Sequence, residues 1–143
     1  MPTTTHTLRL DDLELFADCT KSELRQIDAL TTHLRIPKGQ VLIHQGDVAM
    51  EFIVLCSGAA RVTRETEQGV EVLADIRPGD FLGEMALLGG TRRTATVTAV
   101  TDLDILVSSV GEFRTILDIA PSVARKVRRA SLVRASMQTA EAA

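Results

Sequence analysis

The chain has 143 residues and a formal net charge of −3, and 45% of the residues are hydrophobic although there is no Trp or Tyr and only four Phe. A chain of this length can form one domain with a substantial core, and that core must be mainly aliphatic. No stretch is long and apolar enough for a membrane span or a signal peptide, so we expect a cytoplasmic protein without membrane contact.

The first thirty residues are predicted to form a mobile end followed by two short helices. Residues 1–7 show no periodicity. Apolar residues then recur at helical spacing over 11–18 and 21–30. Thr20 with Glu23 forms a capping box that would begin the second helix.

The middle of the chain is predicted to form short strands. Apolar or alternating segments are separated by turns that contain Gly, such as 37–39 and 67–69. Strands of this length and spacing indicate a mainly β fold with flanking helices, either a sandwich or a jelly-roll barrel. The predicted strands are 32–36, 41–44, 51–56, 59–64, 70–76, 94–100 and 104–108.

Two further helices are predicted after the strands. Ser109 with Glu112 is a second capping box, which would begin a helix that ends near residue 119. Pro121 suits the first position of a final helix over 121–138. One face of this helix is formed by residues that recur in steps of four and three, namely Val123, Val127, Ala130, Arg134 and Met137.

The charge is unevenly distributed along the chain. Residues 1–120 carry 11 Lys and Arg against 18 Asp and Glu, whereas residues 121–143 carry 5 against 1. A basic tail on an acidic body can indicate nucleic-acid binding. Here the basic residues lie largely off the apolar face, and a lone basic helix lacks a second element to fix it in a groove. We therefore expect no direct nucleic-acid binding, and instead a protein partner or a homodimer through the C-terminal helix.

The residue types of metal and catalytic sites do not come together in the sequence. Cys19 and Cys56 lack metal-ligand spacing, and although a disulfide is possible, two buried thiols in a reducing compartment are the preferred interpretation. His6, His33 and His44 are far apart, with no Cys or carboxylate at ligand spacing. We expect no metal, no cofactor and no catalytic arrangement.

The segment FLGEMALLGGTRRTATV, residues 81–97, has the residue types of an anion site. Gly83 lets the backbone approach a ligand closely, and the helix formers from Glu84 onward can begin a short helix with free N–H groups. Arg93 lies nine residues after Glu84, and its planar guanidinium suits a phosphate. A carboxylate beside an anion site requires a ligand that also carries a hydroxyl donor. A ribose with a cyclic phosphate supplies both groups.

This segment resembles the phosphate-binding cassette of the cyclic nucleotide-binding domain family, in which Gly-Glu-x-Ala is followed by Arg-(Ala/Ser/Thr)-Ala. The glycines at 39, 46, 58, 69, 79 and 83 also match the turn spacing of that family. The resemblance implies a double-stranded β-helix (jelly-roll) domain over 8–138, with its cassette at 81–97, a lid helix at 121–138 and a tail at 139–143. The cassette residues that it implies for ligand binding are Gly83, Glu84, Met85, Ala86, Arg93, Thr94 and Ala95.

The resemblance also implies a role for each part of the site. The Gly83 and Ala86 amides and Arg93 would hold the phosphate, Glu84 would accept from the ribose 2′-OH, and Thr94 would lie near phosphate and base. The implied protein is a non-enzymatic sensor that binds cAMP, with cGMP possible, and signals through movement of the lid helix. Residues with an expected place at the base pocket are Val62, Leu73, Ala74 and Arg134.

Several alternatives stay open at this stage. Glu84 could pair permanently with Arg93 in a ligand-free interaction module of the same fold, or the chain could be the sensor part of a transcription regulator. Val62, Leu73 and Ala74 could be ordinary core residues. Arg134 could extend to water or, with the lid closed, contact the base edge or a cassette acceptor.

Overall fold

The computed structural model describes residues 10–84 and 92–142, with side chains in the last helix described as far as Arg134. The helical elements are the 3-10 helices η2 (Leu10–Asp12) and η3 (Glu14–Phe16) and the α-helices α1 (Lys21–Ala29), α3 (Val110–Ile119) and α4 (Pro121–Ala142). The strands are β1 (Thr32–Ile36), β2 (Val41–Ile43), β3 (Glu51–Ser57), β4 (Ala60–Thr66), β5 (Gly69–Ile76), β6 (Phe81–Leu82), β7 (Thr96–Ala99) and β8 (Leu103–Ser109).

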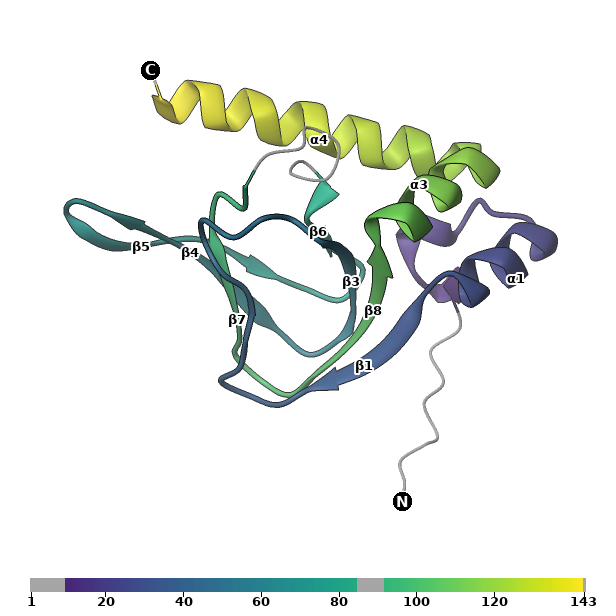
Figure 1. The fold of residues 1–143 in the computed structure, drawn as a ribbon, viewed down its shortest axis with the longest axis horizontal. Helices are drawn as coiled ribbons and strands as arrows, with labels where there is room; N and C mark the ends of the chain where they lie inside the picture. Colours follow the sequence, from purple (N-terminus) through teal and green to yellow (C-terminus); the bar gives the residue numbers. More distant parts are fainter. Residues whose placement is uncertain (1–9, 85–91, 143) are drawn as a thin grey trace.

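The strands form two antiparallel four-stranded sheets, in the orders β1-β8-β3-β6 and β2-β7-β4-β5. Most neighbours in these sheets are not consecutive in the chain, which is typical of a jelly roll. Figure 1 shows α4 lying across the top of the two sheets, with α1 and α3 at one side and the β4–β5 hairpin projecting at the other. The prediction of a mainly β jelly-roll barrel with flanking helices is confirmed.

Strand β3 separates two hydrophobic cores. Phe52 and Val54 point into the core beneath the helices, whereas Ile53 and Leu55 point between the two sheets. Successive side chains of a strand point to opposite faces, so a strand covered on both sides is apolar without interruption. The core between the sheets contains aliphatic residues only, among them Ile43, Ile53, Leu55, Val97 and Ile105.

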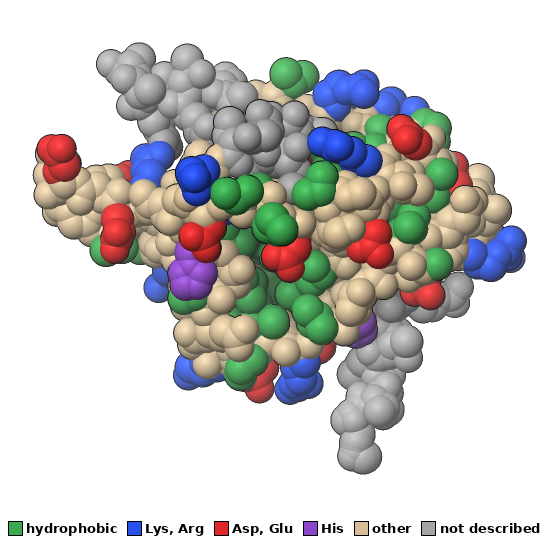
Figure 2. Space-filling view, viewed as in Figure 1, with side chains coloured by type: hydrophobic (Ala, Val, Ile, Leu, Met, Phe, Trp, Pro, Cys, Tyr) green, Lys and Arg blue, Asp and Glu red, His purple; other side chains and the backbone are tan. Residues whose placement is uncertain are grey.

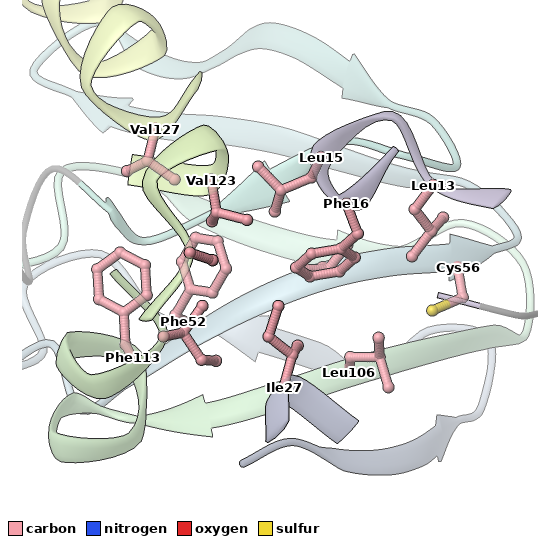
Figure 3. Close-up of a cluster of buried hydrophobic side chains, with 13 residues drawn as sticks. Leu13, Leu15, Phe16, Ile27, Phe52, Cys56, Leu106, Phe113, Val123 and Val127 are labelled. Atoms are coloured by element: carbon pink, nitrogen blue, oxygen red, sulfur yellow. The ribbon is translucent and has the colours of Figure 1, made fainter. Parts of the chain in front are cut away.

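The core beneath the helices contains the larger side chains. Phe16, Phe52 and Phe113 meet Val123 and Val127 of α4 in this core (Figure 3). Val123 and Val127 are 0% and 1% exposed, so the first half of α4 is firmly packed on the domain. Both predicted capping boxes are present, because Thr20 and Ser109 each exchange hydrogen bonds with the Glu three residues later.

The prediction of an N-terminal helix over 11–18 is wrong. The chain instead makes two 3-10 turns, η2 and η3, with Leu13 in an extended conformation between them. In one continuous α-helix Leu13 and Leu15 would point about 200° apart. Breaking the helix buries both of them, at 4% and 2% exposed.

Several other boundaries differ from the sequence prediction by a few residues, and two of them bear on the site. Strand β7 begins at Thr96 rather than residue 94, because the main chain of Arg93 is paired with a loop: Gly46 N donates to Arg93 O and Arg93 N donates to Asp47 O. Helix α4 continues to Ala142 rather than ending near 138. The predicted mobile end, residues 1–7, lies outside the described residues.

The described residues contain no helix that is long and apolar enough to cross a membrane. Cys19 and Cys56 are both free thiols. Cys56 lies in the core beneath the helices, and burial, followed by the nearby Asp104 carboxylate, raises the pKa of its thiol to about 11. This thiol is therefore inert at neutral pH.

Candidate functional site

The site begins where β6 ends, at Gly83. This residue has a φ of +94°, and a Cβ there would lie 2.8 Å from the carbonyl oxygen of Glu51 and would overlap the Arg93 guanidinium. A side chain is therefore excluded by both backbone conformation and space. The close approach that the sequence suggested for a ligand is used here by Arg93. Met85 and Ala86, and the rest of the expected short helix, lie outside the described residues.

Arg93 is held at the inner end of the site. The residue as a whole is 8% exposed, and its Nη2 donates to the carbonyl oxygen of Glu51 at 2.5 Å. The other terminal nitrogen, Nη1, is buried and has no hydrogen-bond partner among the described residues. Burial lowers the pKa of Arg93, while the nearby carboxylates of Glu51 and Glu84 oppose that shift. A buried guanidinium with an unused donor favours an anion at this position.

Glu84 is the most enclosed charged residue of the described site, with 0% of its surface exposed. Its Oε1 accepts from Nη1 of Arg134 in a short ion pair. Its Oε2 is buried and has no partner in residues 10–84 and 92–134. One carboxylate oxygen of Glu84 is therefore bound to the last helix, and the other could accept a hydrogen bond from a hydroxyl group.

Arg134 reaches the site from α4. Besides the ion pair with Glu84, its Nη2 donates to the carbonyl oxygen of Phe81 at 2.9 Å, and its Cζ lies 5.2 Å from the centre of the Phe81 ring. Its side chain is 35% exposed. The structure thus places Arg134 on a cassette acceptor, which was one of the two contacts considered from the sequence, rather than in open solvent.

Nearer the start of α4, Lys126 fixes the helix to the N-terminal 3-10 turns. Its Nζ donates to the Asp18 carboxylate at 3.0 Å and to the Glu14 carbonyl oxygen at 2.5 Å. Partial burial lowers the pKa of Lys126, but the hydrogen bonds with Asp18 and Glu14 outweigh it, so the pKa is raised. Helix α4 is therefore anchored near its start and makes a separate contact with the cassette eight residues later.

The remaining expected residues are more dispersed. Thr94 is exposed and Ala95 half-buried, directly after Arg93. Val62 is half-buried against the core between the sheets and lies opposite the exposed Ala74 in the β4–β5 pairing, with Leu73 half-buried beside it. These three belong to the second sheet, whereas Glu84 follows β6 of the first sheet. Gly83, Glu84, Arg93 and Arg134 are brought together directly.

Two contributors to the site were not predicted from the sequence. The carbonyl oxygen of Glu51 holds Arg93, and a backbone carbonyl has no sequence signature. Phe81 holds Arg134 with both its ring and its carbonyl oxygen. Its position at the start of the cassette, as one of only four Phe, was the available signal. Among the described residues no group of three His, Cys, Asp or Glu could hold a metal ion.

Fold and site together define a jelly-roll domain with a buried arginine that has an unpaired donor and a buried carboxylate that is paired with the last helix. The sequence profile of the cyclic nucleotide-binding domain matches residues 33–119. The chain belongs to the cyclic nucleotide-binding domain family, as the resemblance of its cassette implied.

The relatives that the chain resembles are longer proteins. It is 38% identical over 116 residues to the acetyltransferase Pat of Mycolicibacterium smegmatis, an alignment that covers 81% of the chain and 35% of that protein. It is 32% identical over 120 residues to the cAMP-dependent protein kinase regulatory subunit of Hypocrea atroviridis, covering 83% of the chain and 25% of the relative. The chain therefore spans about a third of the first relative and a quarter of the second.

A solved structure gives the same result at the level of fold. The catabolite activator protein of Thermus thermophilus superposes with a TM-score of 0.76 and 26% sequence identity, over 89% of this chain and 59% of that chain. The family thus occurs in an acetyltransferase, a kinase regulatory subunit and an activator protein.

Proposed function

We propose that this chain is a non-enzymatic sensor that binds a purine 3′,5′-cyclic nucleotide, principally cAMP, through residues of 8–138. The observation that carries the proposal is a pair of buried atoms without partners in the described residues, Nη1 of Arg93 and Oε2 of Glu84. One is a charged donor and the other a charged acceptor. A cyclic phosphate and the ribose 2′-OH next to it satisfy both.

Energetics favour an anion beside Arg93. A buried charged group with one unsatisfied donor costs about 1–3 kcal/mol or more, similar to what one charge-assisted hydrogen bond returns at about 1.5–3 kcal/mol. Gly83 supports the same arrangement because it keeps the space beside the guanidinium free of a side chain. The Gly83 and Ala86 amides would complete the phosphate contacts, with Met85 between them and Thr94 and Ala95 following Arg93.

The enclosure of Glu84 supports a moving lid. A carboxylate with 0% exposure cannot meet a ribose until a covering group moves, and Arg134 of α4 is one such group. In our proposal the nucleotide enters when the last part of α4 is displaced and binds the closed state better. It thereby shifts the population towards that state.

The base is expected to lie against aliphatic atoms and a guanidinium, because the chain has no Trp or Tyr to stack on it. Val62, Leu73 and Ala74 are the proposed wall. We propose cAMP as the principal ligand and measurable binding of cGMP, because the Thr94 hydroxyl offers one hydrogen bond that a guanine amino group can use.

The outer face of α4 is the proposed docking surface for a protein partner or a second copy of the chain. Leu132 and Val133 are 67% and 54% exposed there, on a helix that also carries basic residues on its outer face. The β4–β5 hairpin has the complementary character, with Val70 and Val72 at 67% and 60% exposed and acidic residues at its left end in Figure 2. A second copy could therefore offer its acidic hairpin to the basic helix.

Because the relatives carry this domain within longer proteins, any enzyme activity under its control would belong to another domain or protein.

Isothermal titration of the full chain tests the proposed function. Samples of cAMP, cGMP and 5′-AMP are titrated into the protein under identical conditions. We expect saturable binding of cAMP, weaker binding of cGMP and little binding of 5′-AMP, since the open phosphate places its charge and oxygens differently. Absence of binding with both cyclic nucleotides would leave the chain as a ligand-free interaction module.

A further inference from the structure

We propose that Phe81 is a positioning residue for the lid, which holds the Arg134 guanidinium against Glu84 and so sets how long the nucleotide stays bound. The proposal rests on the proposed function for its effect on the nucleotide, whereas the contact itself is seen directly in the structure. Phe81 begins the cassette segment, but it is not part of the Gly-Glu-x-Ala and Arg-(Ala/Ser/Thr)-Ala pattern to which ligand binding was assigned.

Phe81 holds Arg134 at two points. The guanidinium carbon lies 5.2 Å from the ring centre, within the range of a cation–π contact, and Nη2 donates to the Phe81 carbonyl oxygen at 2.9 Å. The third contact of the same guanidinium is Glu84, three residues later in the chain. Ring, carbonyl and carboxylate therefore form one short platform on a single segment, and the guanidinium fits it only when α4 is closed.

The platform is rigid because its ring is supported from behind. The centres of the Phe81 and Phe52 rings are 5.6 Å apart, and Phe52 stacks on Phe113 of α3 at 4.3 Å. Phe52 and Phe113 are 3% and 1% exposed. Three of the four Phe thus form a continuous wall from α3 to the lid, which fixes the face that Phe81 presents to Arg134.

The position of Phe81 makes the proposal testable without unfolding the protein. Phe81 is half-buried, and it lines a groove of about 620 Å³ beside α4 together with Ala130, Val133 and Arg134. A leucine there can fill most of the apolar volume and keep the backbone carbonyl, but it has no aromatic face. The Phe81→Leu change therefore removes mainly the cation–π contact.

The first experiment measures the rate of cAMP release by surface plasmon resonance from the immobilised full chain. We expect Phe81→Leu to release cAMP roughly three- to tenfold faster, in line with one partly desolvated cation–π contact, and Phe81→Tyr to restore the parent rate. In the Arg134→Ala background Phe81→Leu should change the rate less than twofold. An equal acceleration in both backgrounds would overturn the proposal, because Phe81 would then act by packing alone.

The second experiment needs no nucleotide. Because the chain has no Trp, Phe81→Trp introduces a single indole whose emission reports its surroundings. We expect the emission of Phe81→Trp to differ from that of Phe81→Trp with Arg134→Ala, and thermal unfolding of both confirms that they are folded. Identical spectra would overturn the positioning role even if cAMP binds. A spectral difference without any cAMP binding would support the contact and refute the proposed function instead.

Discussion

The two arginines of the site are held in opposite ways. Arg93 is built into the barrel wall: its main chain is paired with the loop at Gly46 and Asp47, and the residue as a whole is 8% exposed. Arg134 lies on a helix that is anchored at Lys126, and its side chain is 35% exposed. In our proposal this difference means that the phosphate end of the site is fixed, whereas the lid end can form and break.

Glu84 is where the two regions meet. Its Oε1 is paired with Arg134 of α4, and its Oε2 is buried without a partner among the described residues. In our account the fixed region supplies most of the binding free energy. The movable region controls release and responds to the ribose through this one carboxylate.

Replacing Arg93 should have the largest effect. Arg93→Ala removes the charged donor from the fixed region, and the loss of two charge-assisted hydrogen bonds corresponds to on the order of a hundredfold weaker binding or more. Isothermal titration with cAMP measures the loss of affinity. Arg92→Ala is the matched control, because Arg92 is exposed and its Nη1 donates to the carbonyl oxygen of Gly46. Similar losses in both variants would contradict a specific role for Arg93.

Replacing Glu84 should lower the affinity for cAMP more than the affinity for 2′-deoxy-cAMP. Glu84→Ala is expected to weaken cAMP about tenfold or more, the worth of one charge-assisted hydrogen bond, and to change 2′-deoxy-cAMP little. Competition binding with both nucleotides gives the two affinities in one assay. If both ligands weaken equally, the carboxylate does not bind the ribose hydroxyl.

Replacing Thr94 should have the smallest effect and concern the base. Thr94→Ala is expected to weaken cGMP by about 1 kcal/mol, roughly fivefold, and cAMP by less. The comparison is made by titration at one temperature and salt concentration. An equal loss for the two nucleotides would make Thr94 a phosphate contact without influence on base selection.

The sequence predicted the fold, and it selected residues that the structure brings close together, because these features depend on short-range patterns. Glycine turns, alternating strands and two capping boxes each act within a few residues. Arg93 and Glu84 could be selected together because the cassette spacing joins them. The continuous apolar stretch of β3 gave the strand, but its burial on both faces required knowledge of the two cores.

The parts that could not be predicted depend on contacts between distant segments. The periodicity around Leu13 suggested one helix, but the core required Leu13 and Leu15 to point the same way. The support of Arg93 by the Glu51 carbonyl, and of Arg134 by Phe81, connects residues 42 and 53 positions apart. Sequence spacing carries no information on such pairs.

The rates at which cAMP and 2′-deoxy-cAMP leave the parent chain and its Arg134→Ala variant test the central claim most directly. Surface plasmon resonance measures all four rates on folded protein, as checked by thermal unfolding. Our account predicts that Arg134→Ala accelerates cAMP release severalfold and 2′-deoxy-cAMP release much less, because Arg134 acts through the carboxylate that binds the 2′-OH. Arg134→Lys should restore little, since a single ammonium cannot make the planar contacts of the guanidinium. Equal acceleration of both nucleotides, or of neither, would contradict the coupling of lid and ribose through Glu84.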